Sequence, residues 1–162
     1  MKRYGIYALA CFTAILLSSE LAFSLPIVGV GPDLVIVVLA TFAMAEDPKT
    51  AAIAGFATGL GRDLLISSPA GLSAFAYSIT AYSVALAGTA RGVWTYLGLI
   101  AGATFASHAL FGFGSMLLGQ DMSGTPLARV VLVTTGYNSL LAPLLMPLLR
   151  KIALAERPGG AE

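Results

Sequence analysis

The sequence has little charge and almost no cysteine or histidine. Of its 162 residues, 10% are charged, and one cysteine and one histidine are present. An average soluble domain carries about 25% charged residues, because its surface faces water. A single cysteine excludes an internal disulfide framework and any multi-cysteine metal site. With nine Lys and Arg against eight Asp and Glu, the chain also lacks the basic excess of a nucleic-acid-binding surface, so no nucleic-acid partner is expected.

Apolar residues are abundant instead and make up 57% of the chain. A helix needs about 20 of them to cross the hydrocarbon core of a bilayer. Runs that approach this length lie at residues 4–19, 27–45, 50–66, 72–90, 93–118 and 127–149. The connectors between the runs are too short to form a further domain. The sequence therefore predicts one all-α domain over residues 1–162, a polytopic integral membrane bundle of about six transmembrane helices with a short cytoplasmic tail at residues 150–162.

Basic residues indicate the orientation of the bundle, because Lys and Arg near helix ends are retained on the cytoplasmic side. If the N-terminus lies inside, seven basic residues are cytoplasmic and only Arg129 is clearly outside. The seven are Lys2, Arg3, Lys49, Arg91, Arg150, Lys151 and Arg157. Both termini are therefore expected in the cytoplasm. The alternative is that the first run is a signal peptide cleaved near residues 22–24, which would leave five spans.

Three charged residues fall inside the apolar runs. Asp33 lies about 9 Å from the outer end of its span, and Arg62 and Asp63 lie at a similar depth, at 1.5 Å per residue. Charge at such depth is costly and indicates either a charged partner or a function. One interpretation is an ion pair of Arg62 with Asp33 or Asp63. The other is a polar site on the outer side that meets a partner or a ligand.

Pro32 interrupts the second run, since proline removes an amide donor and clashes with the preceding helical turn. We expect irregular backbone at residues 25–31 and a shorter helix at 34–45 whose N-terminus is capped by Asp33. Irregular backbone at membrane depth must be covered by protein or by water. The sequence therefore predicts a shielded depression on the outer side of the bundle.

Small residues recur at intervals of four on two of the runs. Gly55 and Gly59 follow Ala51 in the third run, and Gly98 and Gly102 lie in the fifth. In a membrane, such stripes allow helix backbones to approach closely. We expect each stripe to pack within the chain. The alternative for each is a seat for a transmembrane helix of another protein.

The single histidine, His108, lies near the middle of the fifth run. Because Asp33 and Asp63 are expected nearer the outer surface, we interpret His108 as a hydrogen-bonded packing residue and not as part of a proton relay. The sequence has no metal-ligand set, nucleophile–base pair, phosphate-binding loop or dinucleotide fingerprint. It therefore predicts a protein that is not an enzyme and that has no catalytic residues, no metal and no cofactor.

An ordered motif covers about residues 32–90. The third run reads GFATGLGRDLL from Gly55, the turn SSPAGL follows it, and Pro32 and Asp33 open the second helix. This combination resembles the MreD family of bacterial rod shape-determining membrane proteins. Members show a G-F-x-x-G-L-x-x-D-L-L run followed by a small-residue, Pro, x, Gly turn, and a Pro-Asp pair that falls here on Pro32 and Asp33.

Two further family positions can be carried over to this chain. The family aspartate falls on Asp63, and the family turn falls on Pro69 and Gly71. Arg62 departs from the pattern, because an uncharged residue is usual just before the aspartate. The resemblance therefore marks Asp63 as a candidate partner-binding residue, and Arg62 as a candidate partner for its charge within the chain.

The resemblance implies a non-catalytic scaffold subunit of the cell-elongation (rod) complex, a multi-pass protein of the bacterial cytoplasmic membrane in contact with membrane lipid. It would bind MreC, which has one membrane span and an extracytoplasmic coiled coil. Through MreC it would associate with the actin-like MreB, the polymerase RodA and a penicillin-binding transpeptidase, and so help to organise peptidoglycan synthesis and cell shape. The alternative is a substrate-binding membrane subunit of a small-solute or vitamin transporter, because the family is similar to those of energy-coupling-factor transporters. That alternative predicts a polar pocket near Asp33 and Arg62.

Overall fold

Six helices make up the regular structure of the described residues. The structure, a computed structural model, describes residues 2–24, 30–66, 69–88, 92–119 and 126–154. The helices are α1 (Lys2–Ser24), α2 (Leu34–Ala43), α3 (Pro48–Ile66), α4 (Leu72–Ala87), α5 (Val93–Leu117) and α6 (Leu127–Leu154). They follow the six apolar runs in order, so the prediction of an all-helical chain is confirmed over these ranges.

Some predicted features lie outside the described residues. They include residues 25–29 of the expected irregular segment, the serines at 67 and 68 in the predicted turn, Arg91, and residues 155–162 of the predicted tail.

The helices differ in their ability to cross a membrane. In the described part of the chain, Val93–Leu117 and Leu127–Pro147 are long and apolar enough to do so by length and composition. The apolar stretches Tyr4–Glu20, Leu34–Ala43 and Leu72–Ala87 are shorter. At 1.5 Å per residue, α2 extends only about 15 Å, about half of a hydrocarbon core. The predicted span at 27–45 is therefore not one continuous membrane-crossing helix.

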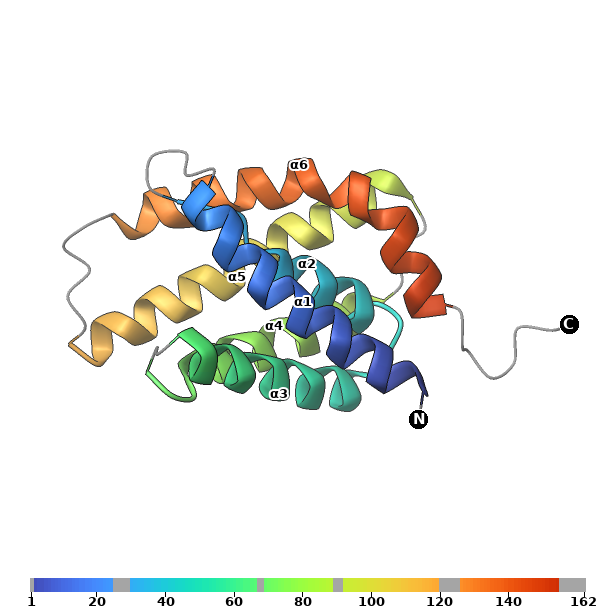
Figure 1. Cartoon of the computed structure of the whole chain (residues 1–162), viewed down its shortest axis with the longest axis horizontal. Coiled ribbons are helices and arrows are strands. Elements are labelled where there is room, and N and C mark those ends of the chain that lie inside the picture. Colours follow the sequence, from blue (N-terminus) through green and yellow to red (C-terminus); the bar gives the residue numbers. More distant parts are fainter. Residues whose placement is uncertain (1, 25–29, 67–68, 89–91, 120–125, 155–162) are drawn as a thin grey trace, which may run out of the picture.

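The short helix α2 lies at the centre of the bundle, with the other helices arranged around it (Figure 1). All ten of its residues are buried. Its sequence, LVIVVLATFA, is apolar on every side, which is the pattern of a helix enclosed by protein. Asp33 caps its N-terminus, because the Oδ1 atom accepts the backbone N–H of Val35 at 3.2 Å. The predicted cap is confirmed, and the helix ends at Ala43, two residues earlier than expected.

The molecule has an apolar exterior and a partly polar interior. Large apolar side chains such as Leu9, Ile53 and Leu140 are exposed on the outside of the bundle. Buried positions include Asp33 and Asp63 together with several hydroxyl and amide side chains. So many large exposed apolar side chains are unusual for a soluble monomer and indicate contact with lipid or protein.

Helices α3 and α4 pack backbone to backbone. A methyl group added at Gly55 would lie 2.5 Å from the carbonyl oxygen of Tyr77, and one at Gly59 would collide with the backbone of Ser73 and Ala74. Because backbone cannot move aside as a flexible side chain can, both positions require glycine. The expected packing of this stripe within the chain is what the structure has.

We therefore expect Gly59→Ala to destabilise the protein by about 1–3 kcal/mol, the usual range for overpacking a tight interface. Gly61→Ala is the matched control, because a methyl group there meets nothing within 4 Å. Alanine at Gly61 should be neutral or stabilise by about 0.5–1 kcal/mol, since glycine weakens a helix interior. Melting temperatures of the two purified variants in the same detergent measure the difference. Equal melting temperatures would contradict the close α3–α4 contact.

Helix α1 begins at the same end of the bundle at which helix α6 ends. The start of α1 and the end of α6 lie together at the right of Figure 1, where α2 also meets α3. The long helix α6 contains Pro143 and Pro147 and bends in its C-terminal part (Figure 1). Proline removes backbone hydrogen bonds from a helix interior, which accounts for the bend.

Candidate functional site

Asp63 caps α4 from the neighbouring helix. Its Oδ2 atom accepts the backbone N–H of Gly71 at 2.9 Å and that of Ser73 at 3.0 Å, and it lies 3.5 Å from the N–H of Ala74. Gly71, the N-cap residue of α4, has a φ of 97° and no side chain to serve as a cap. Asp63 supplies the acceptor that the N-cap residue lacks. Its side chain is buried and committed to the chain itself.

The predicted turn residues lie where the motif requires them. The carbonyl oxygen of Pro69 accepts the N–H of Leu72 at 3.1 Å, and Gly71 occupies the left-handed region that favours glycine. The turn therefore brings the first N–H groups of α4 to the carboxylate of Asp63. This explains physically why the aspartate, the proline and the glycine form one motif.

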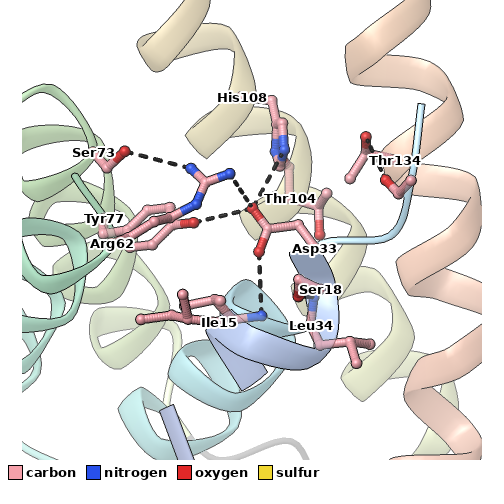
Figure 2. A network of polar contacts seen from close by, with 12 residues as sticks. Ile15, Ser18, Asp33, Leu34, Arg62, Ser73, Tyr77, Thr104, His108 and Thr134 are labelled. Carbon is pink, nitrogen blue, oxygen red and sulfur yellow. Dashed lines mark hydrogen bonds and ion pairs between the residues drawn. The ribbon is translucent and has the colours of Figure 1, made fainter. Parts of the chain in front are cut away.

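Asp33 is the centre of a second polar network, in which side chains of α3, α4 and α5 meet its carboxylate at the start of α2 (Figure 2). Its Oδ2 atom accepts a hydrogen bond from the hydroxyl of Tyr77 at 3.0 Å and lies 3.5 Å from Nη2 of Arg62. The Nε2 atom of His108 lies 3.5 Å from the same oxygen. Asp33 is 4% exposed, so these groups replace water around its carboxylate. The sequence left open whether Arg62 forms an ion pair with Asp33 or with Asp63. In the structure Arg62 forms one with Asp33.

His108 was expected away from the carboxylates, and this prediction was wrong. A straight helix through residues 27–45 would place Asp33 nearer the outer end, whereas the backbone at residues 30–33 is not helical and α2 starts only after Asp33. The carboxylate therefore lies level with the middle of α5. The Nδ1 atom of His108 lies 3.0 Å from the carbonyl oxygen of Thr104. A carbonyl only accepts, so Nδ1 carries a proton and donates, while Nε2 is turned toward Asp33.

Asn138 on α6 holds the backbone at the start of α2. Its Nδ2 atom donates to the carbonyl oxygen of Asp33 at 2.8 Å and to Oγ1 of Thr104 at 3.1 Å. Its Oδ1 atom accepts the N–H of Asp33 at 3.1 Å. Asn138 therefore satisfies backbone groups that the break at Pro32 leaves without helical partners.

A cavity of about 390 Å³ lies beside the Asp33 network. It is lined by residues of α1, α3, α5, α6 and the segment before α2, among them Ser18, Pro32, Arg62, His108, Phe111 and Thr134. Figure 2 shows Thr134 and Ser18 on the side of Asp33 away from Ser73. A cavity is therefore present where Pro32 and Asp33 predicted a depression, and its place on the outer side of the membrane stays a prediction.

The second small-residue stripe is not used for packing within the described part of the chain. A methyl group added at Gly98 or Gly102 would meet nothing within 4 Å. Both glycines line a groove of about 180 Å³ between α4 and α5, together with Thr80, Ser83 and Ala106. The expectation of packing within the chain was correct for Gly55 and Gly59 and wrong for this stripe. This face of α5 borders α4 across the groove without close contact, a separation that spacing alone does not give.

Sequence reasoning missed three members of the Asp33 network. Tyr77, His108 and Asn138 lie on three different helices, and each is a polar side chain within an apolar run. Polar groups at membrane depth tend to face one another and not lipid. That tendency was the available signal, but it could not say which residues meet.

These features define a class of protein: an apolar helix bundle with a polar interior network. Within the described residues, no cluster of three His, Cys, Asp or Glu side chains could hold a metal ion. The chain belongs to the MreD family, since the family model of the rod shape-determining protein MreD matches residues 2–153. Comparison with curated proteins and with solved structures gives no match.

Membership of the family confirms the resemblance read from the motif. It assigns the chain to a membrane-associated family of rod shape-determining proteins, which has a structural role.

Proposed function

We propose that this protein is a non-catalytic scaffold subunit of the rod complex that binds the transmembrane helix of MreC within the bilayer. Family membership supports a role in rod shape determination. The uncovered stripe at Gly98 and Gly102 supports the mode of action, because small residues let a second helix approach the backbone of α5. Through MreC the protein would associate with MreB, RodA and a penicillin-binding transpeptidase.

The proposed docking face has the dimensions of a helix contact. Lining residues from 98 to 106 extend about 12 Å along α5, at 1.5 Å per residue, and α4 forms the opposite wall. A groove between two helices fits one convex helix. Two copies of this chain related by a twofold axis would place groove against groove and leave a void, which disfavours self-association through this face.

We further propose that the protein crosses the cytoplasmic membrane several times with both termini in the cytoplasm. The distribution of basic residues supports this orientation. The shared end of α1 and α6 in Figure 1 is consistent with it. In this orientation the Asp33 network and its cavity lie toward the outer half of the bundle.

Replacing both Gly98 and Gly102 with leucine should prevent MreC binding without unfolding the protein. A Cβ at either position meets nothing within 4 Å, so the substitutions create no collision with the backbone at that atom. We expect at least a tenfold loss of MreC recovered by affinity purification from detergent, with an unchanged gel-filtration profile. A helix held away by two leucine side chains loses the close packing on which association in lipid depends.

The control is Gly61→Leu, which places the same side chain in open space on α3. This variant should retain MreC. Failure of the folded, unaltered protein to recover MreC would contradict the scaffold function itself. Retention of MreC by the double variant would leave the scaffold function in place and remove the α4–α5 groove as its docking face.

One observation favours the alternative of a solute-binding subunit: the cavity lies beside Asp33 and Arg62, where that alternative predicted a pocket. The two charges form an ion pair with each other, however, so they are not both available to bind a charged solute. The cavity therefore supports binding of a ligand but supplies no argument for transport.

A further inference from the structure

We propose that the cavity beside Arg62 binds the oxyanion group of an amphiphile, a carboxylate or phosphate carried on an apolar chain. The proposal concerns ligand binding and does not depend on MreC. It is based on the shape and lining of the cavity, on the unused donors of Arg62, and on the way in which Asp33 is already bonded.

The size and lining of the cavity suit a ligand with an apolar body. Its volume of about 390 Å³ falls within the range of small-molecule sites, which is about 300–1,000 Å³. Apolar residues from four parts of the chain contribute to its wall, among them Val30, Ile66, Phe111, Leu127 and Val130. A fully polar solute would leave these side chains against polar groups. An acyl or similar chain would pack against them.

Arg62 is the group that would hold the charged end. A guanidinium has five N–H donors. In the described structure its Nη1 atom lies 3.4 Å from the hydroxyl of Ser73 and its Nη2 atom lies 3.5 Å from Asp33. Both contacts are longer than the 2.7–2.9 Å that is typical of charge-assisted hydrogen bonds. Arg62 therefore has donors in reserve while its side chain lines the cavity.

Aromatic rings hold the guanidinium in this place. The Cζ atom lies 5.6 Å from the ring centre of Tyr77 and 5.9 Å from that of Phe111. A planar guanidinium positioned by rings can present its edge to two oxygens at once, the geometry that carboxylate and phosphate share. Lysine has no such edge, so a lysine at position 62 would not hold the two oxygens in this way.

Asp33 argues against a cationic ligand. Its carboxylate already accepts from the N–H of Val35 and the hydroxyl of Tyr77 and forms an ion pair with Arg62, with His108 close by. It is also almost completely buried. An ammonium group would have to displace one of these donors, whereas an oxyanion can use donors of Arg62 that are not engaged. The site therefore favours the negative end of an amphiphile.

Thermal stability in a neutral detergent tests the proposal. The probes are dodecanoate as a soluble single-chain acid, dioleoylphosphatidylglycerol in mixed micelles with that detergent as an anionic lipid, and dodecyltrimethylammonium as a cation with a twelve-carbon chain like that of dodecanoate. A ligand that binds only the folded state raises its melting temperature. At 100-fold excess over the dissociation constant, we expect an increase of about 5–10 °C with at least one anionic probe.

The two anionic probes distinguish the sources of the ligand. A shift with dodecanoate alone indicates a soluble acid, a shift with the lipid alone indicates a headgroup, and both results support the oxyanion site. No shift with either probe, or an equal shift with the cation, overturns it.

Two variants locate the binding. Val130→Trp fills the cavity without touching the polar network and should abolish the shift, while Leu132→Trp on the exposed face of α6 should retain it. The double variant Asp33→Asn with Arg62→Met removes the guanidinium but leaves no unpaired charge. It should weaken binding of the anionic probe at least tenfold. An unchanged shift in Val130→Trp, or in the double variant if Val130→Trp does not fold, would overturn the proposal.

Discussion

Asp63→Ala should greatly reduce the yield of folded protein. The substitution removes the acceptor for the N–H groups at the start of α4, and Gly71 has no side chain to replace it. Each buried donor left without an acceptor costs about 1–3 kcal/mol. A total loss of about 3 kcal/mol or more is a large share of the 5–15 kcal/mol that keeps a typical domain folded. Fluorescence-detected gel filtration of detergent extracts measures the folded fraction.

Asp47→Ala is the matched control for this prediction. Asp47 caps α3 in the same manner, because its Oδ1 atom accepts the N–H groups of Lys49 and Thr50 at 3.1 Å. It lies in the connector between α2 and α3, where hydrogen bonds from Thr50 hold the pKa of its carboxyl below the ordinary value. Water can replace this exposed cap, so the folded yield should change little.

The two variants separate capping from partner binding. If Asp63 met a partner instead, Asp63→Ala would keep its folded yield and lose complex formation with MreC. A folded yield equal to that of Asp47→Ala would therefore contradict the capping role.

The elements that could be predicted are those fixed by local chemistry. The six helices follow from the apolar runs. The cap of α2 follows from Pro32, because the helix can begin only after the proline, where the side chain of Asp33 can accept the N–H of Val35. The turn after α3 follows from Pro69 and Gly71 for the same reason. In each case the relevant atoms lie within a few residues of one another, so sequence spacing determines the geometry.

The elements that could not be predicted depend on how helices are rotated against each other. The stripes at Gly55 and Gly98 have the same spacing, yet one faces α4 closely and the other lines an open groove. His108 was misplaced because the depth of Asp33 depends on the path of residues before α2. Rotation and path are set by all six helices together, so no single segment of sequence determines them.

The Asp33 network shows what the polar interior contributes. Apolar side chains gain little by contacting each other in lipid. Specific polar contacts between helices therefore contribute more to which helix arrangement is the most stable. Asp33 links the start of α2 to Arg62 on α3, to Tyr77 on α4 and to His108 on α5. Asn138 adds α6 through the backbone of the same residue. One residue therefore fixes the register of five helices.

This arrangement leads to a second large expected effect. Asp33→Ala should destabilise the protein by about 3–5 kcal/mol, because it leaves the guanidinium of Arg62 buried without its carboxylate. Arg62→Met should have a similar effect, since it leaves the carboxylate of Asp33 without its cation. Both single variants are expected to have a lower melting temperature. Their folded yield should also fall in the gel-filtration assay used for Asp63.

The double variant Asp33→Asn with Arg62→Met should recover much of this loss. Asparagine retains the Oδ1 acceptor for the N–H of Val35, its amide NH2 can donate to the hydroxyl oxygen of Tyr77, and methionine fills the volume of the arginine stem without charge. Replacing a buried ion pair by neutral groups of similar size is often close to neutral in stability, whereas removing one partner is not. The double-mutant cycle, with Asp33→Asn and Arg62→Met as its single variants, measures this coupling. If the losses of these single variants simply add, the two charges do not stabilise each other, and the ion pair is incidental to the fold.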